Sequence, residues 1–164
     1  MGRFIFASLS LLVVAFYLSG IGADHHCPFG WLSHNVSCYK FFKSWMTWDQ
    51  AQRFCMEQQE NGHLASIKDV GESFKLSNYI SQRLKILGVW IGLRFSKRKG
   101  NWEWSDGSSN THTSWEPGEP NNLFNKEFCV ELTARSRYLQ WNDKDCKYQH
   151  PFVCMFQPGS QASR

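Results

Sequence analysis

Five oxygen-bearing side chains gather in the C-terminal third of this 164-residue chain: Glu119, Asn121, Glu127, Asn142 and Asp143. Three are carboxylates and two are amides, with no thiol or imidazole among them. Hard cations such as Ca²⁺ take roughly 6–8 oxygen ligands of these kinds, whereas zinc and copper favour nitrogen and sulfur. The set therefore predicts a calcium site. A plain polar surface loop is the alternative, because Pro, Gly and Asn are also common in loops.

The segment that carries the first two of these residues, 105–126, is a long connection with few aliphatic side chains. A connection of this length without regular structure is unusual in a compact domain and is usually functional. The elements on either side must therefore position it.

Two helices are predicted in the first half of the chain. Thr47 and Gln50 have the spacing of a capping box, and apolar residues then recur at helical intervals until Asn61-Gly62. Asp69 and Glu72 form a second capping box before another apolar helical face. Strands are predicted where β-prone residues cluster, at 36–42, 64–67, 89–93, 102–104, 128–132, 138–141 and 151–154. Helices followed by antiparallel strands favour the α+β class.

The N-terminus has the pattern of a secretory signal peptide at residues 1–23. Arg3 supplies the positive charge, an apolar run follows over 4–18, and small residues end at Ala23. The run is short for a membrane span, and no second one follows. We therefore expect a secreted, extracellular protein without membrane insertion, with a single domain over 24–157 and a loose polar tail over 158–164.

An even number of cysteines in a secreted chain predicts a disulfide framework. Fifteen pairings of six cysteines are possible, and spacing alone does not choose among them. The cysteines are Cys27, Cys38, Cys55, Cys129, Cys146 and Cys154. Asn35 begins the one glycosylation sequon of the chain, Asn35-Val36-Ser37, so we expect a glycan there. An unoccupied surface turn is the alternative.

The remaining patterns exclude other classes of function. A formal net charge of +4 with scattered basic residues is too mild for a nucleic-acid-binding protein. The basic cluster at 97–100 is typical of a solvated hairpin tip, with a heparin-like patch as the alternative. A secreted hydrolase would need an activated Ser, His or paired-carboxylate site, and no such pattern is present, so we predict that the protein is not an enzyme.

Three motifs and the cysteine spacing together resemble a C-type lectin domain, from Cys27 to Cys154. The motifs are Trp90-Ile91-Gly92-Leu93, Glu119-Pro120-Asn121 and Trp141-Asn142-Asp143. The opening residues 27–31 and the stretch 125–132 are similar to the C-type lectins of snake venoms in particular.

This resemblance implies two helices flanking two small antiparallel sheets, with a long calcium-binding loop. It implies the disulfides Cys27–Cys38, Cys55–Cys154 and Cys129–Cys146, a cis bond between Glu119 and Pro120, and a calcium ion held by the five oxygen-bearing residues named first. The same residues would bind two vicinal sugar hydroxyls coordinated directly to calcium. In this family Glu-Pro-Asn accompanies mannose-type ligands, so the resemblance implies a mannose-binding lectin that agglutinates cells if it is multivalent.

The sequence departs from some family members at two places. Phe95, Asn122 and Phe128 stand where acids would hold a second calcium, so we expect that site to be absent. Ser109 stands where disulfide-linked dimers carry a cysteine, so we do not expect a covalent dimer of that type; a non-covalent homodimer and a monomer both stay open. The alternative function is a venom toxin subunit that binds platelet receptors or clotting factors, and the intact calcium ligand set argues against it.

Overall fold

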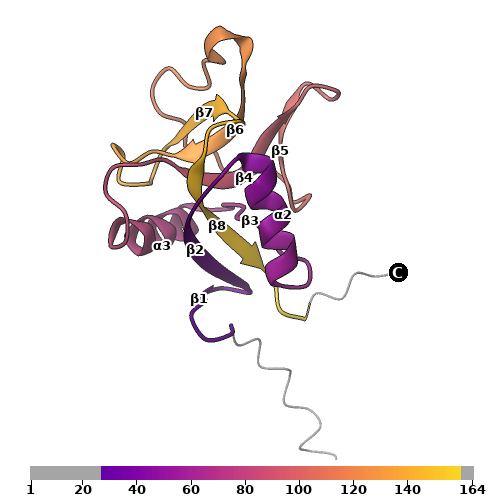
Figure 1. Cartoon of the computed structure of the whole chain (residues 1–164), viewed down its shortest axis with the longest axis vertical. Helices are drawn as coiled ribbons and strands as arrows, with labels where there is room; N and C mark the ends of the chain where they lie inside the picture. The colour runs from indigo at the N-terminus through magenta and orange to yellow at the C-terminus, as the bar shows by residue number, and fades with distance from the viewer. Residues whose placement is uncertain (1–26, 160–164) are drawn as a thin grey trace, which may run out of the picture.

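The computed structural model describes residues 27–159 of the chain, so the predicted signal peptide lies outside the described residues. The elements in chain order are β1 (Leu32–His34), β2 (Ser37–Met46), α2 (Trp48–Gln58), β3 (His63–Leu64), α3 (Val70–Ser81), β4 (Val89–Ser96), β5 (Asn101–Trp104), the short 3-10 turn η1 (Leu123–Asn125), β6 (Glu127–Leu132), β7 (Trp141–Asp145) and β8 (His150–Phe156). In Figure 1, α3 and α2 lie on opposite sides of β8, and β6, β7 and the long loop form the upper end. The predicted α+β class is confirmed.

The strands form one sheet in the order β1-β2-β8-β4-β6-β7, with β3 added to β8 and β5 added to β4. Nearly all pairings are antiparallel. The exception is β4 with β8, which pair in parallel at Trp90 and Phe152. The two small sheets that we expected are therefore joined at this point, where the lower strands meet the strands that carry the loop.

Local sequence chemistry determines where the helices begin. The Thr47 side chain accepts from the Gln50 N–H at 3.3 Å, and the Gln50 side chain accepts from the Thr47 N–H at 3.0 Å, so the first capping box is confirmed. Asp69 caps α3 by accepting from the Glu72 N–H at 2.8 Å. The second box is incomplete, because the Glu72 carboxylate accepts from the Lys68 N–H at 2.5 Å instead.

Two apolar clusters form the core, one on each face of the sheet. One contains α3 residues such as Leu76 and Ile80 packed with Trp141. The other surrounds the Cys55–Cys154 disulfide, between α2 and the strands that meet at Trp90. All three disulfides expected from the resemblance are present: Cys27–Cys38, Cys55–Cys154 and Cys129–Cys146.

Most predicted strands differ from the observed ones by a few residues, and three differ more clearly. The strand expected at 138–141 is wrong, because Arg137 and Tyr138 adopt positive φ angles of 56° and 65° in a turn, and β7 begins only at the end of that stretch. The strand expected at 64–67 is reduced to the two residues of β3, and the one expected at 36–42 continues four residues further as β2. None of the helices within residues 27–159 is both long and apolar enough to cross a membrane.

Candidate functional site

The loop between β5 and β6 is held to the body of the protein at its middle. Trp115 pairs with Trp141 in an isolated bridge, the Trp141 N–H donates to the Ser114 carbonyl at 2.8 Å, and the Glu116 N–H donates to the Trp141 carbonyl at 2.9 Å. The following Glu119–Pro120 peptide bond is cis, as expected from the resemblance. In Figure 1 the loop lies at the end of the molecule opposite β1.

Glu116 fixes the same part of the loop to the turn that follows β6. Its side chain is 5% exposed and accepts from the Arg135 Nε at 2.8 and 2.7 Å, from the Arg135 Nη2, and from the Thr133 hydroxyl at 2.5 Å. Hydrogen bonds from Arg135 hold the pKa of Glu116 below its usual value, against the effect of burial. The sequence analysis missed Glu116, because its partners come from a distant turn.

Asp143 joins the tip of the loop to β7. The residue is fully buried, and its two carboxylate oxygens accept from the backbone N–H groups of Asn121 at 3.1 Å and Asn122 at 2.7 Å. A buried carboxylate with two charge-assisted hydrogen bonds is a strong local constraint. Asp143 therefore fixes the backbone of the Glu-Pro-Asn motif.

Glu119 and Asn121 form a local pair on that motif. The Glu119 carboxylate accepts from the Asn121 side-chain amide at 2.9 Å and from its backbone N–H at 3.0 Å. Burial raises the pKa of Glu119, and the nearby carboxylates of Asp143 and Glu127 raise it further. Asp143 and Glu127 are thus close enough to oppose the ionisation of Glu119.

Glu127 stands at the start of β6 and is 7% exposed. Its side chain accepts from the Leu123 N–H at 3.0 Å, and its own N–H donates to the Asn122 side chain at 3.2 Å. Burial raises the pKa of Glu127, and the charge of Asp143 adds to the effect.

The fifth predicted residue, Asn142, is oriented differently. Its side-chain amide donates to Glu131 at 3.0 Å, and the other oxygen of Glu131 lies 3.0 Å from the His150 Nε2. Glu131 is a second residue that the sequence analysis missed. It is near enough to Glu127 to raise the pKa of that carboxyl, so Asn142 borders the acidic cluster without sharing a hydrogen bond with it.

The donor set suits a hard cation in its chemistry. Among the described residues, no basic side chain forms an ion pair with Glu119, Glu127 or Asp143. Burial and neighbouring carboxylates raise the pKa values of the two glutamates, and for Glu127 this outweighs the lowering by the charge of Lys144. However, their oxygens are engaged by amides of the loop, and no ready-made cluster of three His, Cys, Asp or Glu groups is arranged around one point in residues 27–159. A cation would exchange for those amide contacts.

The residues that marked the two departures have other contacts. Phe95 packs edge-on against Trp102, with ring centres 5.3 Å apart, and lies 6.3 Å from Phe128, while Asn122 supports the start of β6. The absence of a second calcium stays a prediction. All six cysteines of the sequence are paired within the chain, so none remains for a bridge to another chain.

Comparison with known proteins gives consistent matches. The profile of the Lectin C-type domain family matches residues 44–156. "C-type lectin 1" of Hydrophis hardwickii is 71% identical over 99% of both chains, and "C-type lectin lectoxin-Phi1" of Philodryas olfersii is 70% identical over 95% of this chain and 100% of its own.

Solved structures show the same fold. Human lithostathine is similar with a TM-score of 0.75 and 32% identity, over 80% of this chain and 99% of its own. The carbohydrate-recognition domain of cow CD23, solved in the presence of a GlcNAc2Man3 oligosaccharide, is similar with a TM-score of 0.68 and 31% identity, over 80% of this chain and 96% of its own.

Proposed function

This chain belongs to the C-type lectin domain family, whose members are non-enzymatic binding proteins, and on that premise we propose that it is a secreted, calcium-dependent lectin for mannose-type glycans. The observation that carries the proposal is the group of three unneutralised carboxylates, Glu119, Glu127 and Asp143, gathered around the Glu-Pro-Asn motif. A plain polar loop would have no physical reason to bring three acids together without a basic partner.

Calcium would be held by Glu119, Asn121, Glu127, Asn142 and Asp143. When bound, the ion supplies positive charge and open coordination positions that sugar hydroxyls can fill in place of water. Of these residues, Asn142 is the one whose side chain is hydrogen-bonded to an acid outside the set, Glu131. Because its amide nitrogen is the donor in this contact, the Asn142 Oδ1 can act as a ligand while the contact to Glu131 is kept.

The side chains of the motif would determine which sugars bind. Glu119 offers an acceptor and Asn121 a donor, and the two are already hydrogen-bonded to each other at 2.9 Å. Glu127 and Asn142 supply a second acceptor and donor. Two adjacent hydroxyls of one sugar can each donate to a carboxylate and accept from an amide. The equatorial hydroxyl pair of mannose suits this arrangement, whereas galactose has one axial hydroxyl at the corresponding place.

Support for a carbohydrate ligand also comes from the relatives. The cow CD23 domain was solved in the presence of an oligosaccharide that contains mannose. An extracellular location agrees with three disulfides, which persist in oxidising compartments. It also agrees with the exposed position of Asn35, in the turn between β1 and β2, where a glycan could be attached.

Two measurements on the wild-type protein test the proposal. Calorimetric titration should find one functional calcium per chain, and a glycan array with calcium should show mannose-type ligands that are lost on addition of a chelator. Binding to galactose with no response to mannose, in the presence of calcium, would contradict the mannose assignment. Agglutination requires more than one sugar-binding site in each protein assembly, so a non-covalent homodimer should agglutinate cells and a monomer should not.

A double variant tests the role of the motif. Glu119→Gln with Asn121→Asp reverses acceptor and donor and keeps an oxygen at both positions. A mismatched polar group costs roughly 1–3 kcal/mol, so the preference should move toward galactose by about tenfold or more. The matched control is Asn125→Asp, which changes an exposed amide in the same loop outside the proposed ligand set. An unchanged preference in the double variant would refute this reading of the motif.

A protein-binding toxin is the second candidate, favoured by the relative named as a lectoxin. Such a protein would bind platelet receptors or clotting factors through protein contacts. Binding to platelets that survives both chelator and excess mannose would favour this candidate. Binding that is lost under either condition would favour the lectin.

A further inference from the structure

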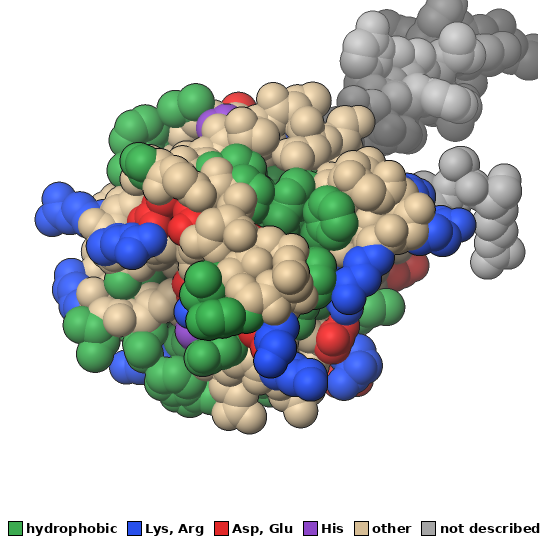
Figure 2. Space-filling model, turned by 90° about the horizontal axis from the view of Figure 1, so that it is seen from above, with side chains coloured by type: hydrophobic (Ala, Val, Ile, Leu, Met, Phe, Trp, Pro, Cys, Tyr) green, Lys and Arg blue, Asp and Glu red, His purple; other side chains and the backbone are tan. Residues whose placement is uncertain are grey.

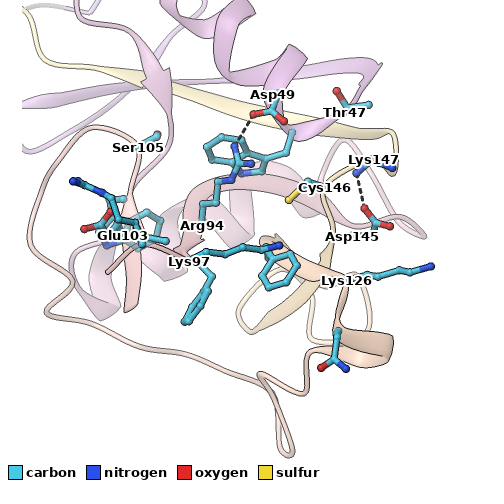
Figure 3. Close-up of a pocket in the computed structure, with 17 residues that line it drawn as sticks. Thr47, Asp49, Arg94, Lys97, Glu103, Ser105, Lys126, Asp145, Cys146 and Lys147 are labelled. Carbon is cyan, nitrogen blue, oxygen red and sulfur yellow. Dashed lines mark hydrogen bonds and ion pairs between the residues drawn. The ribbon is translucent and has the colours of Figure 1, made fainter. Parts of the chain in front are cut away.

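A groove separate from the acidic cluster lies between the start of α2 and the β4–β5 hairpin. Its volume is about 960 Å³, and the chain around Lys126 and Lys147 closes its other side. A cavity of roughly 300–1,000 Å³ is typical of a site for a small ligand. Figure 3 shows Lys97 lying across the groove between Arg94 and the segment that carries Lys126.

Some of the charged side chains in this groove form ion pairs and others do not. Arg94 donates to Asp49 at 2.6 Å, and Glu103, on the wall, accepts from Lys99 at 2.6 Å. Four exposed basic side chains on the lining form no ion pair among the described residues: Lys97, Arg98, Lys126 and Lys147. Figure 2 shows several Lys and Arg side chains gathered at the lower right, around an acidic group.

Aromatic rings lie beneath these cations. The Lys97 Nζ is 4.0 Å from the centre of the Phe128 ring, and the Arg94 guanidinium is 5.1 Å from the Trp48 ring. Phe95 and Phe128 are each half-buried and line the groove. The groove therefore combines the half-buried rings of Phe95 and Phe128 with unpaired positive charge.

None of the five proposed calcium ligands lines this groove. Glu127 and Phe128 are consecutive in β6, at a point where its pairing with β7 shifts register, and their side chains have different contacts. Glu127 accepts from the loop at Leu123, while Phe128 meets Lys97 from the hairpin. A ligand in the groove would therefore need neither calcium nor the Glu-Pro-Asn motif.

We propose that this groove is a second, calcium-independent binding site for sulfated saccharides. Sugar rings have flat apolar faces that pack on aromatic side chains, and sulfates pair with lysine and arginine. An acidic peptide would match the charge but not the aromatic floor, and the volume accommodates a few sugar units. This goes beyond the proposed mannose function, because it adds a different ligand class at a different place.

The test uses dextran sulfate oligosaccharides, unsulfated dextran and polyglutamate, each titrated into the full protein with chelator present. Dextran sulfate should bind and unsulfated dextran should not. Lys97→Ala with Lys147→Ala removes one cation from each wall and should weaken binding by about tenfold. Lys43→Ala with Lys75→Ala removes the same charge at exposed positions outside the groove and should weaken it by less than about twofold.

Each contrary result overturns the proposal. If dextran sulfate does not bind, the groove is not a binding site for sulfated saccharides. If the two double variants weaken binding equally, the binding is general charge attraction. If polyglutamate binds equally well, the ligand class is not saccharide. Thermal unfolding of both variants establishes that each is folded. Mannose binding with calcium is measured alongside, so its failure would contradict the proposed lectin function and leave the groove standing.

Discussion

Two parts of the long loop depend on carboxylates in opposite ways: its attachment at Glu116 (the base), and the Glu-Pro-Asn motif with the adjacent start of β6 (the tip). At the base, Glu116 is buried and paired with Arg135 and Thr133, and its pKa is lowered. At the tip, Glu119 and Glu127 have raised pKa values and no basic partner among the described residues. A carboxylate paired with a basic side chain therefore holds the loop in place, whereas the carboxylates without such a partner are available for a cation.

Asp143→Asn should have the largest effect of the changes that test this difference. It removes a charge from the centre of the cluster while keeping the shape of the side chain, and calcium affinity depends strongly on the charge of the ligands. We expect calcium and mannose binding to fall by about a hundredfold or more, measured by calorimetric titration. Asp145→Asn, on the same strand but outside the proposed ligand set, is the control. Equal calcium binding by Asp143→Asn and Asp145→Asn would contradict a special role of Asp143 in the proposed calcium site.

Glu116→Ala should act on stability rather than directly on the proposed ligands. It leaves the buried Thr133 hydroxyl with fewer partners and removes the pairing with Arg135. Because Arg135 is largely exposed and remains solvated, we expect a loss of roughly 1–3 kcal/mol in the free energy of unfolding, measured with urea. If Glu116→Ala left stability unchanged and abolished calcium binding, Glu116 would act in the calcium site rather than in the attachment of the loop.

The pH dependence of stability should also differ in sign between Glu116 at the base and Glu119 at the tip. The folded pKa of Glu116 lies below its ordinary value of 4.5, so its contribution is present above that value and is lost as the pH falls through the folded pKa. The folded pKa of Glu119 is raised, so its charge opposes folding at neutral pH and protonation relieves this as the pH falls.

Urea midpoints of calcium-free protein measure the difference. Between neutral pH and about pH 3, which lies below the ordinary glutamate range, Glu116→Gln should reduce the acid-induced loss of stability. Glu119→Gln should instead raise stability at neutral pH and have little effect in acid. Shifts of the same sign in both variants would contradict the comparison.

Arg135→Lys should have the smallest effect. Lysine keeps the charge beside Glu116 but loses the planar group that meets both carboxylate oxygens. Since the side chain is largely exposed, the free energy of unfolding should fall by less than about 1 kcal/mol. A larger loss would mean that hydrogen-bond geometry, rather than charge, holds the base of the loop.

Local chemistry was sufficient to predict some of these elements and insufficient for others. Thr47 and Gln50 satisfy each other within one turn, so the start of α2 follows from the sequence. The turn at Arg137 and Tyr138 does not. A buried tyrosine occurs in turns as well as in strands, so the residue type alone does not distinguish the two. Disulfide pairing came from the family resemblance, since residue spacing left fifteen alternatives.

The proximity of the candidate residues was predictable from the motifs, whereas not all of their contacts were. Motif positions identified the acids and amides, and the structure brings Glu119, Asn121, Glu127 and Asp143 together. The contact of Asn142 depends on Glu131, eleven residues before it. Such a partner is fixed by strand pairing between β6 and β7, which no local pattern specifies.

The turn that carries Asn35 has a consequence for how copies of this protein meet. It joins β1 to β2, and β1 lies at the end of the molecule opposite the Glu-Pro-Asn loop (Figure 1). An oligosaccharide on Asn35 would leave from one pole while the proposed sugar site faces the other. A chain could not fill its own site with its own glycan, but a mannose-bearing glycan could be captured by the next molecule. Glycan processing in the producing cell would then control head-to-tail self-association.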